Sequence, residues 1–456
     1  MTSNSELLIS YLKRVNYWWE TGKISDEDKG KPRDEYIEQI FKYLKVNRII
    51  CLTGIRRSGK TTLLYQIIDR LINNGVDPLK IVYLKMDDII GILTNLRELE
   101  DIYMELFGID IKTNQIYFLI DEIHVMKDWQ RQIKYFIDFK YKSKFIVSGS
   151  SRTLLFREAS ESLVGRIIFI NVFPLSFKEF IAFYGIKLSV PKINLRRLEF
   201  EKIRRIYLQL IDKKPIIQNK LNEYIEVGGF PEWFKIRNKI LWYRLLSDDY
   251  FTLTIAKDIL LIFNPRDPIL LNRLAREIAK LTTERFSYLG LANKFDTSKD
   301  TIRQYIYYLS SSMLIFIAEK YTKKGLSQER SPKKIYFWEE GLRRAITLDQ
   351  SIGKSVENIV VWHLIKLGAS IDPTFIPFYW KNKYEVDFIF AVDDVLVPIE
   401  VKYRGHVTIP KGFIELSRKK ILFDKAIVVT KDTLDCKRYE TFEVFFIPLW
   451  LFLLIL

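Results

Sequence analysis

The spacing of apolar residues divides the chain into segments that differ in their expected secondary structure. In residues 47–173, short apolar runs alternate with stretches in which apolar residues recur every three or four positions. The runs predict buried strands, and the stretches between them predict amphipathic helices. The five expected strands cover residues 49–53, 81–86, 116–121, 145–148 and 167–172. Strands that alternate with helices predict a parallel sheet with helices on both faces, which places this segment in the α/β class.

The sequence on either side of this segment predicts three further parts. Residues 1–46 form an N-terminal extension whose adjacent tryptophans, Trp18 and Trp19, we expect to pack against the sheet domain rather than to stack on a ligand. Residues 174–265 have helical periodicity and predict a helical lid over a bound nucleotide. Residues 346–456 predict the order α-β-β-β-α-β.

Residues 266–345 have the spacing of a winged helix-turn-helix. Ser298 is placed to cap the recognition helix, and Lys299 and Arg303 lie on that helix. A basic hairpin is expected at residues 323–324. Such a domain binds either DNA or another protein, and the sequence leaves both alternatives open.

A phosphate-binding loop is predicted between the first strand and the helix at residues 62–71. Residues 54–61 read Gly-Ile-Arg-Arg-Ser-Gly-Lys-Thr, which fits the pattern G-x-x-x-x-G-K-[ST]. Free main-chain N–H groups and the positive end of the helix dipole bind an anion at such a position. We expect Lys60 to contact the β- and γ-phosphates and Thr61 to bind Mg²⁺. The expected nucleotide-binding residues are Gly54, Ile55, Arg56, Arg57, Ser58, Gly59, Lys60, Thr61 and Thr62.

Two carboxylates follow the third apolar run. Asp121 and Glu122 stand directly after residues 115–120. A carboxylate at the end of a buried strand is costly to desolvate without a partner, and Mg²⁺ is a suitable partner. We therefore expect Asp121 to bind the metal and Glu122 to polarise the attacking water. The alternative is an ordinary solvated strand end.

Polar residues near the fourth and fifth strands are further candidates for the site. Ser148 and Ser150 follow the fourth apolar run, where a polar side chain can contact the γ-phosphate, although a plain small-residue turn explains them nearly as well. Arg166 precedes the fifth strand. It could stabilise charge in the transition state, in the same chain or in a neighbouring subunit, or it could be an ordinary surface arginine.

A second group of candidate catalytic residues lies in the C-terminal segment. Asp387, Glu400 and Lys402 have the residue types and order of a PD-(D/E)xK nuclease site. Side chains alternate along a strand, so Glu400 and Lys402 share one face, and Asp387 can face them from the hairpin partner. Two carboxylates can hold Mg²⁺, and Glu357 could complete the set of metal ligands. The alternative is a hairpin with charged residues on its solvated face.

Composition narrows the class of protein. The net charge of +16 fits a nucleic-acid partner, but a heavily charged surface of thermophilic type explains it equally well. Two cysteines, Cys51 and Cys436, exclude a disulfide scaffold and suggest a reducing cytoplasm. The apolar run at residues 445–456 is short for a membrane span and contains a proline, so we expect a buried strand and helix and no membrane contact.

Taken together, these motifs resemble a known family. The chain is similar to prokaryotic AAA+-type P-loop ATPases, common in archaea, that carry a C-terminal restriction-endonuclease-like domain. The resemblance is carried by Trp129 and by residues 54–62, 119–124, 148–151, 163–166, 174–180, 228–232, 335–337, 341–343, 357–358, 385–388 and 400–403. It implies ATP binding and slow hydrolysis. Trp338-Glu339-Glu340 departs from the family's pattern, in which a turn of shorter side chains precedes Gly341.

The sequence therefore predicts an ATPase that uses ATP and Mg²⁺ and acts as a DNA-associated switch. It leaves open a C-terminal nuclease activity and assembly into a homo-oligomer. The alternative is a signalling or scaffold ATPase whose nuclease-like domain is inactive and only binds partners.

Overall fold

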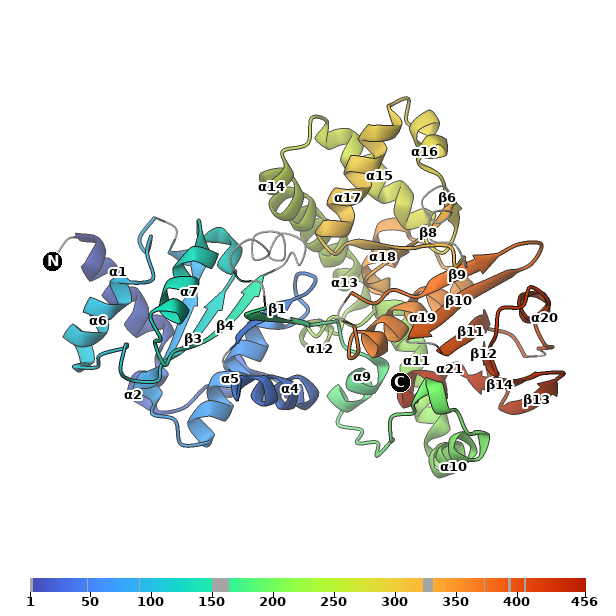
Figure 1. Cartoon of the computed structure of the whole chain (residues 1–456), viewed down its shortest axis with the longest axis horizontal. Helices are drawn as coiled ribbons and strands as arrows, with labels where there is room; N and C mark the ends of the chain where they lie inside the picture. Colours follow the sequence, from blue (N-terminus) through green and yellow to red (C-terminus); the bar gives the residue numbers. More distant parts are fainter. Residues whose placement is uncertain are drawn as a thin grey trace. The chain divides into compact units, whose positions relative to one another are not determined.

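The computed structural model describes residues 3–46, 48–89, 91–149, 163, 165–322, 331–372, 374–392, 395–405 and 407–456. Its contacts divide the chain into two compact units, Met1–Val172 and Phe173–Leu456, which we describe separately (Figure 1). Ser150 and the hairpin expected at residues 323–324 lie outside the described residues.

The first unit is built on a five-stranded parallel sheet, as the sequence predicts. The strand order is β2-β3-β4-β1-β5, and every neighbouring pair is parallel. The strands are β1 (Ile49–Thr53), β2 (Ile81–Lys85), β3 (Tyr117–Asp121), β4 (Lys144–Gly149) and β5 (Ile167–Asn171). All the carboxyl ends of the strands therefore lie on one edge of the sheet, where α/β proteins place their ligands.

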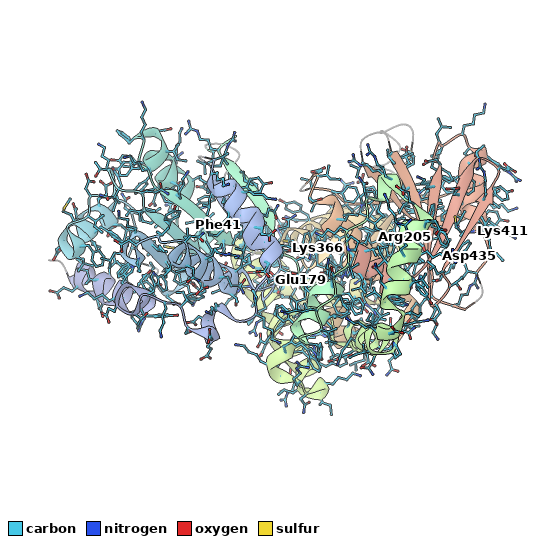
Figure 2. The ribbon with its side chains drawn as sticks, turned by 90° about the horizontal axis from the view of Figure 1, so that it is seen from below. Phe41, Glu179, Arg205, Lys366, Lys411 and Asp435 are labelled. Atoms are coloured by element: carbon cyan, nitrogen blue, oxygen red, sulfur yellow. The ribbon has the colours of Figure 1, made fainter. Side chains whose placement is uncertain are left out.

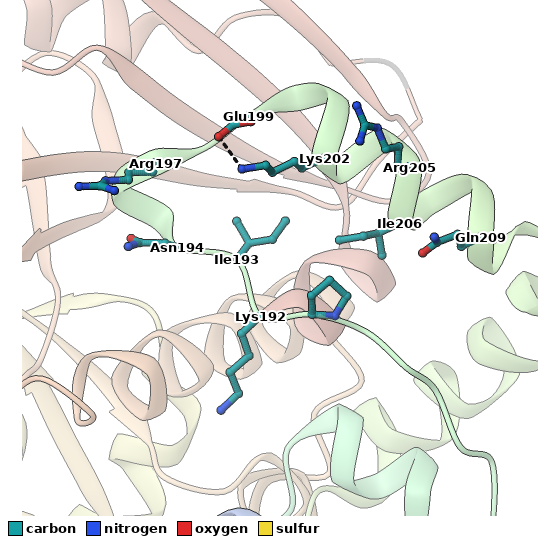
Figure 3. Close-up of a pocket in the computed structure, with 10 residues that line it drawn as sticks. Lys192, Ile193, Asn194, Arg197, Glu199, Lys202, Arg205, Ile206 and Gln209 are labelled. Atoms are coloured by element: carbon teal, nitrogen blue, oxygen red, sulfur yellow. Dashed lines mark hydrogen bonds and ion pairs between the residues drawn. The ribbon is translucent and has the colours of Figure 1, made fainter.

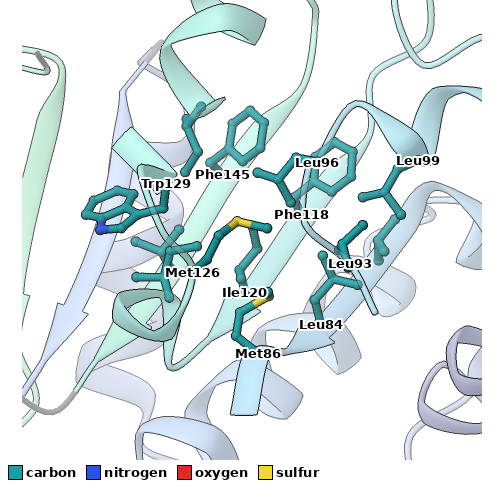
Figure 4. Packing of buried hydrophobic residues seen from close by; sticks show 14 of the residues in the cluster. Leu84, Met86, Leu93, Leu96, Leu99, Phe118, Ile120, Met126, Trp129 and Phe145 are labelled. Carbon is teal, nitrogen blue, oxygen red and sulfur yellow. The ribbon is translucent and has the colours of Figure 1, made fainter. Parts of the chain in front are cut away.

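Helices cover both faces of this sheet. Alternate residues of β1 belong to different apolar cores: Ile50 and Leu52 pack in one, and Ile49 and Cys51 in the other. Figure 4 shows the second core, in which Phe118 and Phe145 stack at 5.0 Å. The helices are α1 (Ser3–Val15), α2 (Trp18–Thr21), α3 (Asp26–Lys29), α4 (Asp34–Leu44), α5 (Lys60–Asn73), α6 (Glu98–Phe107) and α7 (Trp129–Asp138).

The N-terminal extension is part of the first unit, because it completes the exposed edge of strand β2. The side chain of Asn16 accepts a hydrogen bond from Tyr83 N at 2.6 Å and donates one to Tyr83 O at 3.1 Å. The indole N–H groups of Trp18 and Trp19 both donate to Ile81 O. Side chains thus satisfy main-chain groups that an edge strand otherwise leaves unpaired.

The second unit begins with a helical region. It comprises α9 (Phe177–Phe183), α10 (Phe200–Leu210), α11 (Lys214–Val227), α12 (Trp233–Ile236), α13 (Lys239–Leu245), the π-helical segments Leu246–Phe251 and Thr254–Leu260, and α14 (Leu261–Phe263). A role for this region as a lid over the nucleotide stays a prediction.

Three helices and a small sheet follow in the order α-β-α-α-β-β. They are α15 (Pro268–Lys280), β6 (Arg285–Phe286), α16 (Tyr288–Lys294), α17 (Lys299–Ser311), β7 (Ile315–Ala318) and β8 (Lys333–Phe337). The sheet order is β6-β8-β7. Ser298 caps α17 as expected, accepting a hydrogen bond from Thr301 N at 3.0 Å.

The C-terminal part contains a six-stranded mixed sheet with the order β13-β14-β12-β11-β10-β9. Its strands are β9 (Phe378–Lys381), β10 (Glu385–Val392), β11 (Val395–Lys402), β12 (Lys425–Thr430), β13 (Asp435–Tyr439) and β14 (Phe442–Pro448). Its helices are α18 (Glu340–Thr347), α19 (Ile352–Gly368), α20 (Lys411–Arg418) and α21 (Leu449–Ile455). The apolar C-terminal run is a buried strand followed by a buried helix. Within the described residues, no helix has the length and apolar character needed to cross a membrane.

The residues that depart from the family's pattern have a structural role in the second unit. Glu339 is buried and caps α18 by accepting a hydrogen bond from Leu342 N at 2.6 Å. Its other oxygen accepts one from Gly229 N at 2.7 Å. Gly228 has a φ of 78°, and a Cβ atom there would lie 2.7 Å from the main-chain nitrogen of Gly341, so the turn that meets Glu339 requires glycine. Burial raises the pKa of Glu339 to about 7, although its main-chain N–H partners oppose the rise.

Candidate functional site

The predicted phosphate-binding loop joins the carboxyl end of β1 to the first residue of α5. Gly59 has a φ of 96° in the left-handed region, which favours glycine. A Cβ atom on Gly54 would lie 2.2 Å from the carbonyl oxygen of Val172, so only glycine fits there. The main chain therefore turns tightly enough to direct its N–H groups toward an anion at the helix N-terminus.

Lys60 lies over this loop. Its Nζ donates hydrogen bonds to Gly54 O at 2.8 Å and to Ile55 O at 3.2 Å. The side chain is thus held over the loop, where a phosphate would replace the two carbonyl partners.

Asp121 lies at the centre of a buried polar cluster beside the loop. Its Oδ2 accepts hydrogen bonds from Thr61 Oγ1 at 2.6 Å and from Tyr83 OH at 3.2 Å. Its Oδ1 accepts one from Ser148 Oγ, which in turn accepts a bond from Glu122 N at 3.3 Å. Burial raises the pKa of Asp121, Glu122 adds to the rise, and Ser148, Thr61 and Lys60 oppose it. The structure therefore brings Thr61, Asp121 and Ser148 together, as the sequence predicts.

Glu122 extends the same cluster toward the carboxyl edge of the sheet. Its main chain is left-handed, with a φ of 52°. Its Oε2 lies 3.3 Å from Nδ1 of His124, and neither atom has a hydrogen-bond partner among the described residues. A buried carboxylate oxygen without a donor is costly, so this atom is suited to receive a proton or a water.

The residues present fit a nucleotide with Mg²⁺. Ser58 Oγ, in the middle of the loop, is buried without a hydrogen-bond partner among the described residues. Thr61 and Asp121 supply hydroxyl and carboxylate oxygens, the ligand types that Mg²⁺ binds. These two residues would hold the metal, which neutralises phosphate charge when bound.

Arg166 does not belong to this site within one chain. It directly precedes β5, and β5 runs parallel to β1, with Ile167 opposite Ile49. Arg166 therefore lies at the amino edge of the sheet, about 16 Å from the loop at roughly 3.3 Å per strand residue. Its guanidinium pairs with Asp138 at 2.7 Å. The expected role within the same chain is wrong for this geometric reason, and a role in a neighbouring subunit stays a prediction.

The replacement Arg166→Ala tests the remaining role. We expect wild-type ATP hydrolysis at dilute protein, because the side chain cannot reach the loop of its own chain. The variant should hydrolyse ATP more slowly than wild type only at protein concentrations where self-association increases the specific activity of the wild type. Phosphate release measured over a range of protein concentrations checks this. If the variant were slower by the same factor at every protein concentration, Arg166 would act within its own chain, contrary to its position in the sheet.

Two further residues contact the site, and the sequence pattern did not identify them. Tyr83 on β2 donates to Asp121, and burial raises its pKa far above the ordinary value. Arg33, from the N-terminal extension, donates from its guanidinium to Ser58 O at 3.0 Å. Both contacts are long-range, so no local spacing signals them.

The predicted C-terminal residues also lie close together, with Asp387 facing Glu400 and Lys402 as strand alternation predicts. Asp387 and Glu400 face each other at the end of the β10–β11 ladder. Glu400 Oε2 accepts a hydrogen bond from Asp387 N at 3.2 Å, and Asp387 Oδ2 accepts one from Val401 N at 2.8 Å. Lys402 Nζ pairs with Glu400 Oε1 at 2.6 Å. Burial raises the pKa of Glu400 to about 8, with Asp387 adding to the rise and Lys402 opposing it.

A buried lysine neutralises the rest of this cluster. Lys334, on β8, places Nζ 3.0 Å from Glu357, 2.7 Å from Glu385 and 3.6 Å from Asp387. Its side chain is only 3% exposed. Burial alone would lower the pKa of Lys334, but Tyr336 and the three carboxylates raise it well above the ordinary value. The lysine therefore carries its charge inside the cluster.

This arrangement corrects the predicted metal site of Glu357, Asp387 and Glu400. Among the described residues, no three carboxylate, histidine or cysteine side chains are grouped so that they could hold a metal ion. Lys334 pairs with Glu357 and Asp387, and Lys402 pairs with Glu400, so lysine ammonium groups supply the positive charge that a metal would bring. The residues do not fit the metal, and nuclease chemistry at Asp387, Glu400 and Lys402 stays a prediction.

Comparison with known proteins divides the chain into three matched regions. Residues 46–181 match the AAA domain family. Residues 218–352 and 352–452 each match a domain of unknown function. An uncharacterised protein of Haemophilus influenzae is 25% identical over 435 residues, which cover 92% of this chain and 98% of that protein. An uncharacterised protein of Methanocaldococcus jannaschii is 27% identical over 360 residues, which cover 77% of this chain and 74% of that protein.

Solved structures give weaker likenesses. The Aeropyrum pernix ORC1 protein in complex with DNA has a TM-score of 0.32 at 10% identity, covering 70% of this chain and 94% of that one. AMPPCP-bound DnaA from Aquifex aeolicus has a TM-score of 0.25 at 16% identity, covering 60% of this chain and 86% of that one. The sheet order, the loop after β1 and the family match agree that residues 46–181 are a P-loop nucleotide-binding domain of the AAA type.

Proposed function

We propose that the protein binds ATP and hydrolyses it at the carboxyl edge of the first unit's sheet, and that it acts as a DNA-associated switch. The loop from Gly54 to Thr61 and the ammonium of Lys60 bind the phosphates. Thr61 and Asp121 are the residues that would hold Mg²⁺. Glu122 orients and polarises the attacking water, and Ser148 fixes the positions of Asp121 and Glu122.

One observation carries the ATPase proposal. Asp121 is buried at 1% exposure and is hydrogen-bonded to Thr61 of the loop and to Ser148 of the neighbouring strand. One buried oxygen of Glu122 beside it lies 3.3 Å from Nδ1 of His124 but makes no hydrogen bond among the described residues. A site built only for structure would satisfy that oxygen. The arrangement supports a metal-binding carboxylate and a water-activating carboxylate with separate tasks.

The replacement Glu122→Gln tests the proposal. Glutamine keeps the size of the side chain but cannot accept a proton, so ATP binding should persist while phosphate release falls by roughly 10²–10⁴-fold, the range of a lost general base. Binding of labelled ATP and release of phosphate should be measured on the same preparation, with Mg²⁺ and with EDTA. Hydrolysis at the wild-type rate in the variant would refute the role of Glu122.

The DNA association rests on the second unit. The order of α15, β6, α16, α17, β7 and β8 is the order of a winged helix-turn-helix. Lys299 and Arg303 are exposed on α17, where a recognition helix carries its contacts. The net charge of +16 supports a polyanionic partner.

One observation favours a second candidate function, partner binding, for the C-terminal domain. Lys334 and Lys402 neutralise the acidic cluster without a metal. This supports a domain that binds a partner and does not cut it, in line with the rule that a fold alone does not determine an activity.

A further inference from the structure

One short segment of the second unit carries a large surplus of positive charge and lines a cavity. Residues 187–214 carry nine basic side chains against three acidic ones, so 28 residues hold a net charge of +6 out of +16 for the whole chain. The basic residues are Lys187, Lys192, Arg196, Arg197, Lys202, Arg204, Arg205, Lys213 and Lys214. We call this segment the basic face. None of its residues belongs to the nucleotide site or to the expected recognition helix.

Four basic residues of this face line a cavity of about 580 Å³ (Figure 3). The loop that carries Lys192 and Arg197 forms one side, and Lys202 and Arg205 of α10 form the other. Glu199 is the one carboxylate among the lining residues, and it pairs with Lys202 at 2.7 Å. The lining thus has four cationic side chains and one anionic side chain.

The segment that carries the basic face packs against the rest of the second unit. One side of α10 is buried through Ile203, Ile206 and Leu210. Further contacts attach the segment to helix α21 and strand β14. Ile193 N donates to Ile455 O at 2.8 Å, Tyr207 packs on Trp450 with ring centres 5.5 Å apart, and Phe200 packs on Phe445 with ring centres 6.4 Å apart. The charged residues must therefore point outward. Figure 2 shows Arg205 on this part of the second unit.

An ordinary solvated helix face does not explain this pattern. Such a face usually mixes charges of both signs. The basic face contains two such pairs, Lys202–Glu199 at 2.7 Å and Arg204–Glu201 at 3.7 Å, but its basic residues outnumber its acidic ones by nine to three. Like charges close together repel and reduce stability unless an anion binds. The volume alone would suit a small ligand, but basic side chains continue past the cavity to Arg196 and Lys213. An extended polyanion fits this distribution better than a single phosphate does.

We infer that the basic face binds the phosphate backbone of DNA. This inference rests on the DNA association proposed above and adds a second contact surface to it. Arg197, in the turn before α10, and Arg205, on α10, present planar, permanently charged groups that can each contact a phosphate. The segment that carries both packs on β14 and α21. Contacts of this kind position the DNA and carry no sequence preference.

The test is DNA binding by the full-length double variant Arg197→Ala/Arg205→Ala. Fluorescence anisotropy with a labelled 30-base-pair duplex should be recorded over a series of salt concentrations. Loss of two phosphate contacts should reduce the slope of log K against log salt by about 1.8 and weaken binding roughly 10- to 30-fold at 0.15 M salt. Both residues are exposed, so the variant should unfold at the wild-type temperature.

The matched control is Lys383→Ala/Lys419→Ala, which removes the same charge from exposed positions elsewhere in the second unit. It should keep the wild-type slope. Equal affinities and slopes for the two double variants would overturn the inference while leaving DNA association through Lys299 and Arg303 intact. If the wild-type protein does not bind the duplex, the proposed DNA association itself would be refuted. Tighter binding to RNA of the same sequence would overturn the assignment of DNA.

Discussion

Lys60→Ala should strongly reduce ATP hydrolysis and remove the stabilisation that ATP gives to the first unit. In the structure, Nζ of Lys60 bonds two carbonyl oxygens of the loop, at Gly54 and Ile55, and is placed to contact the phosphates. A ligand at 100 times its Kd stabilises a protein by about 2.7 kcal/mol, so wild-type protein should unfold at a clearly higher temperature with ATP. The variant should show almost no shift, and phosphate release should fall by roughly 10²–10³-fold.

Calorimetry with and without ATP measures the first effect, and a phosphate-release assay measures the second. Lys112→Ala is the matched control, because Lys112 is exposed and precedes β3, at the edge of the sheet opposite the loop. That control should keep both the ATP shift and the activity. A Lys60→Ala protein that ATP stabilises as strongly as wild type would contradict the assignment of the loop.

The nucleotide site was largely predictable because its determinants are local. The loop sequence, the apolar run before it and the helical spacing after it all lie within about 25 residues. Asp121 and Ser148 could also be predicted from the sequence, because each stands at the end of a buried strand. Parallel strands bring their carboxyl ends to one edge of the sheet. The same rule explains the error at Arg166. That residue precedes its strand, and in a parallel sheet it must lie at the opposite edge.

The C-terminal cluster was only partly predictable, because its deciding residue comes from another predicted domain. Lys334 lies on β8, in the segment assigned to the winged helix, and the predicted boundary at 345/346 separates it from Glu357 and Asp387. Further bonds cross that boundary, since Asn358 accepts from Phe337 N at 3.0 Å. Spacing along the chain shows which residues share a strand face, but it does not show which distant side chain fills the space between them.

Lys334→Met should destabilise the second unit strongly, by about 3–5 kcal/mol, the usual cost of breaking a buried ion pair by removing one partner. Methionine fills much of the same volume but leaves Glu357, Glu385 and Asp387 without their shared cation. Urea unfolding followed by tryptophan fluorescence measures the loss. Adding ATP should identify the two unfolding transitions. ATP should shift the transition of the first unit, which contains the nucleotide loop, and should leave that of the second unit unchanged.

The loss of stability caused by Lys334→Met should depend on pH. Burial raises the pKa of Glu357 from 4.5 to about 7, with Asp387 adding to the rise and Lys334 opposing it. A raised carboxyl pKa means that the folded protein keeps a proton that the unfolded chain releases, so this group makes the protein less stable as pH rises from about 4.5 to about 7. Without Lys334 the pKa should rise further. The destabilisation should therefore be larger at pH 8 than at pH 5.

Lys437→Ala is the matched control for Lys334→Met, because it breaks a lysine–carboxylate pair of the same unit at the surface. Lys437 lies 3.4 Å from Asp435, and the two side chains are 50% and 43% exposed. Its removal should cost no more than about 1 kcal/mol, since solvent screens exposed pairs. A Lys334→Met protein as stable as this control would show that the ammonium does not neutralise the cluster. Restored stability on adding Mg²⁺ to the Lys334→Met protein would show that the cluster can hold a metal once the lysine is gone, and would revive the nuclease prediction.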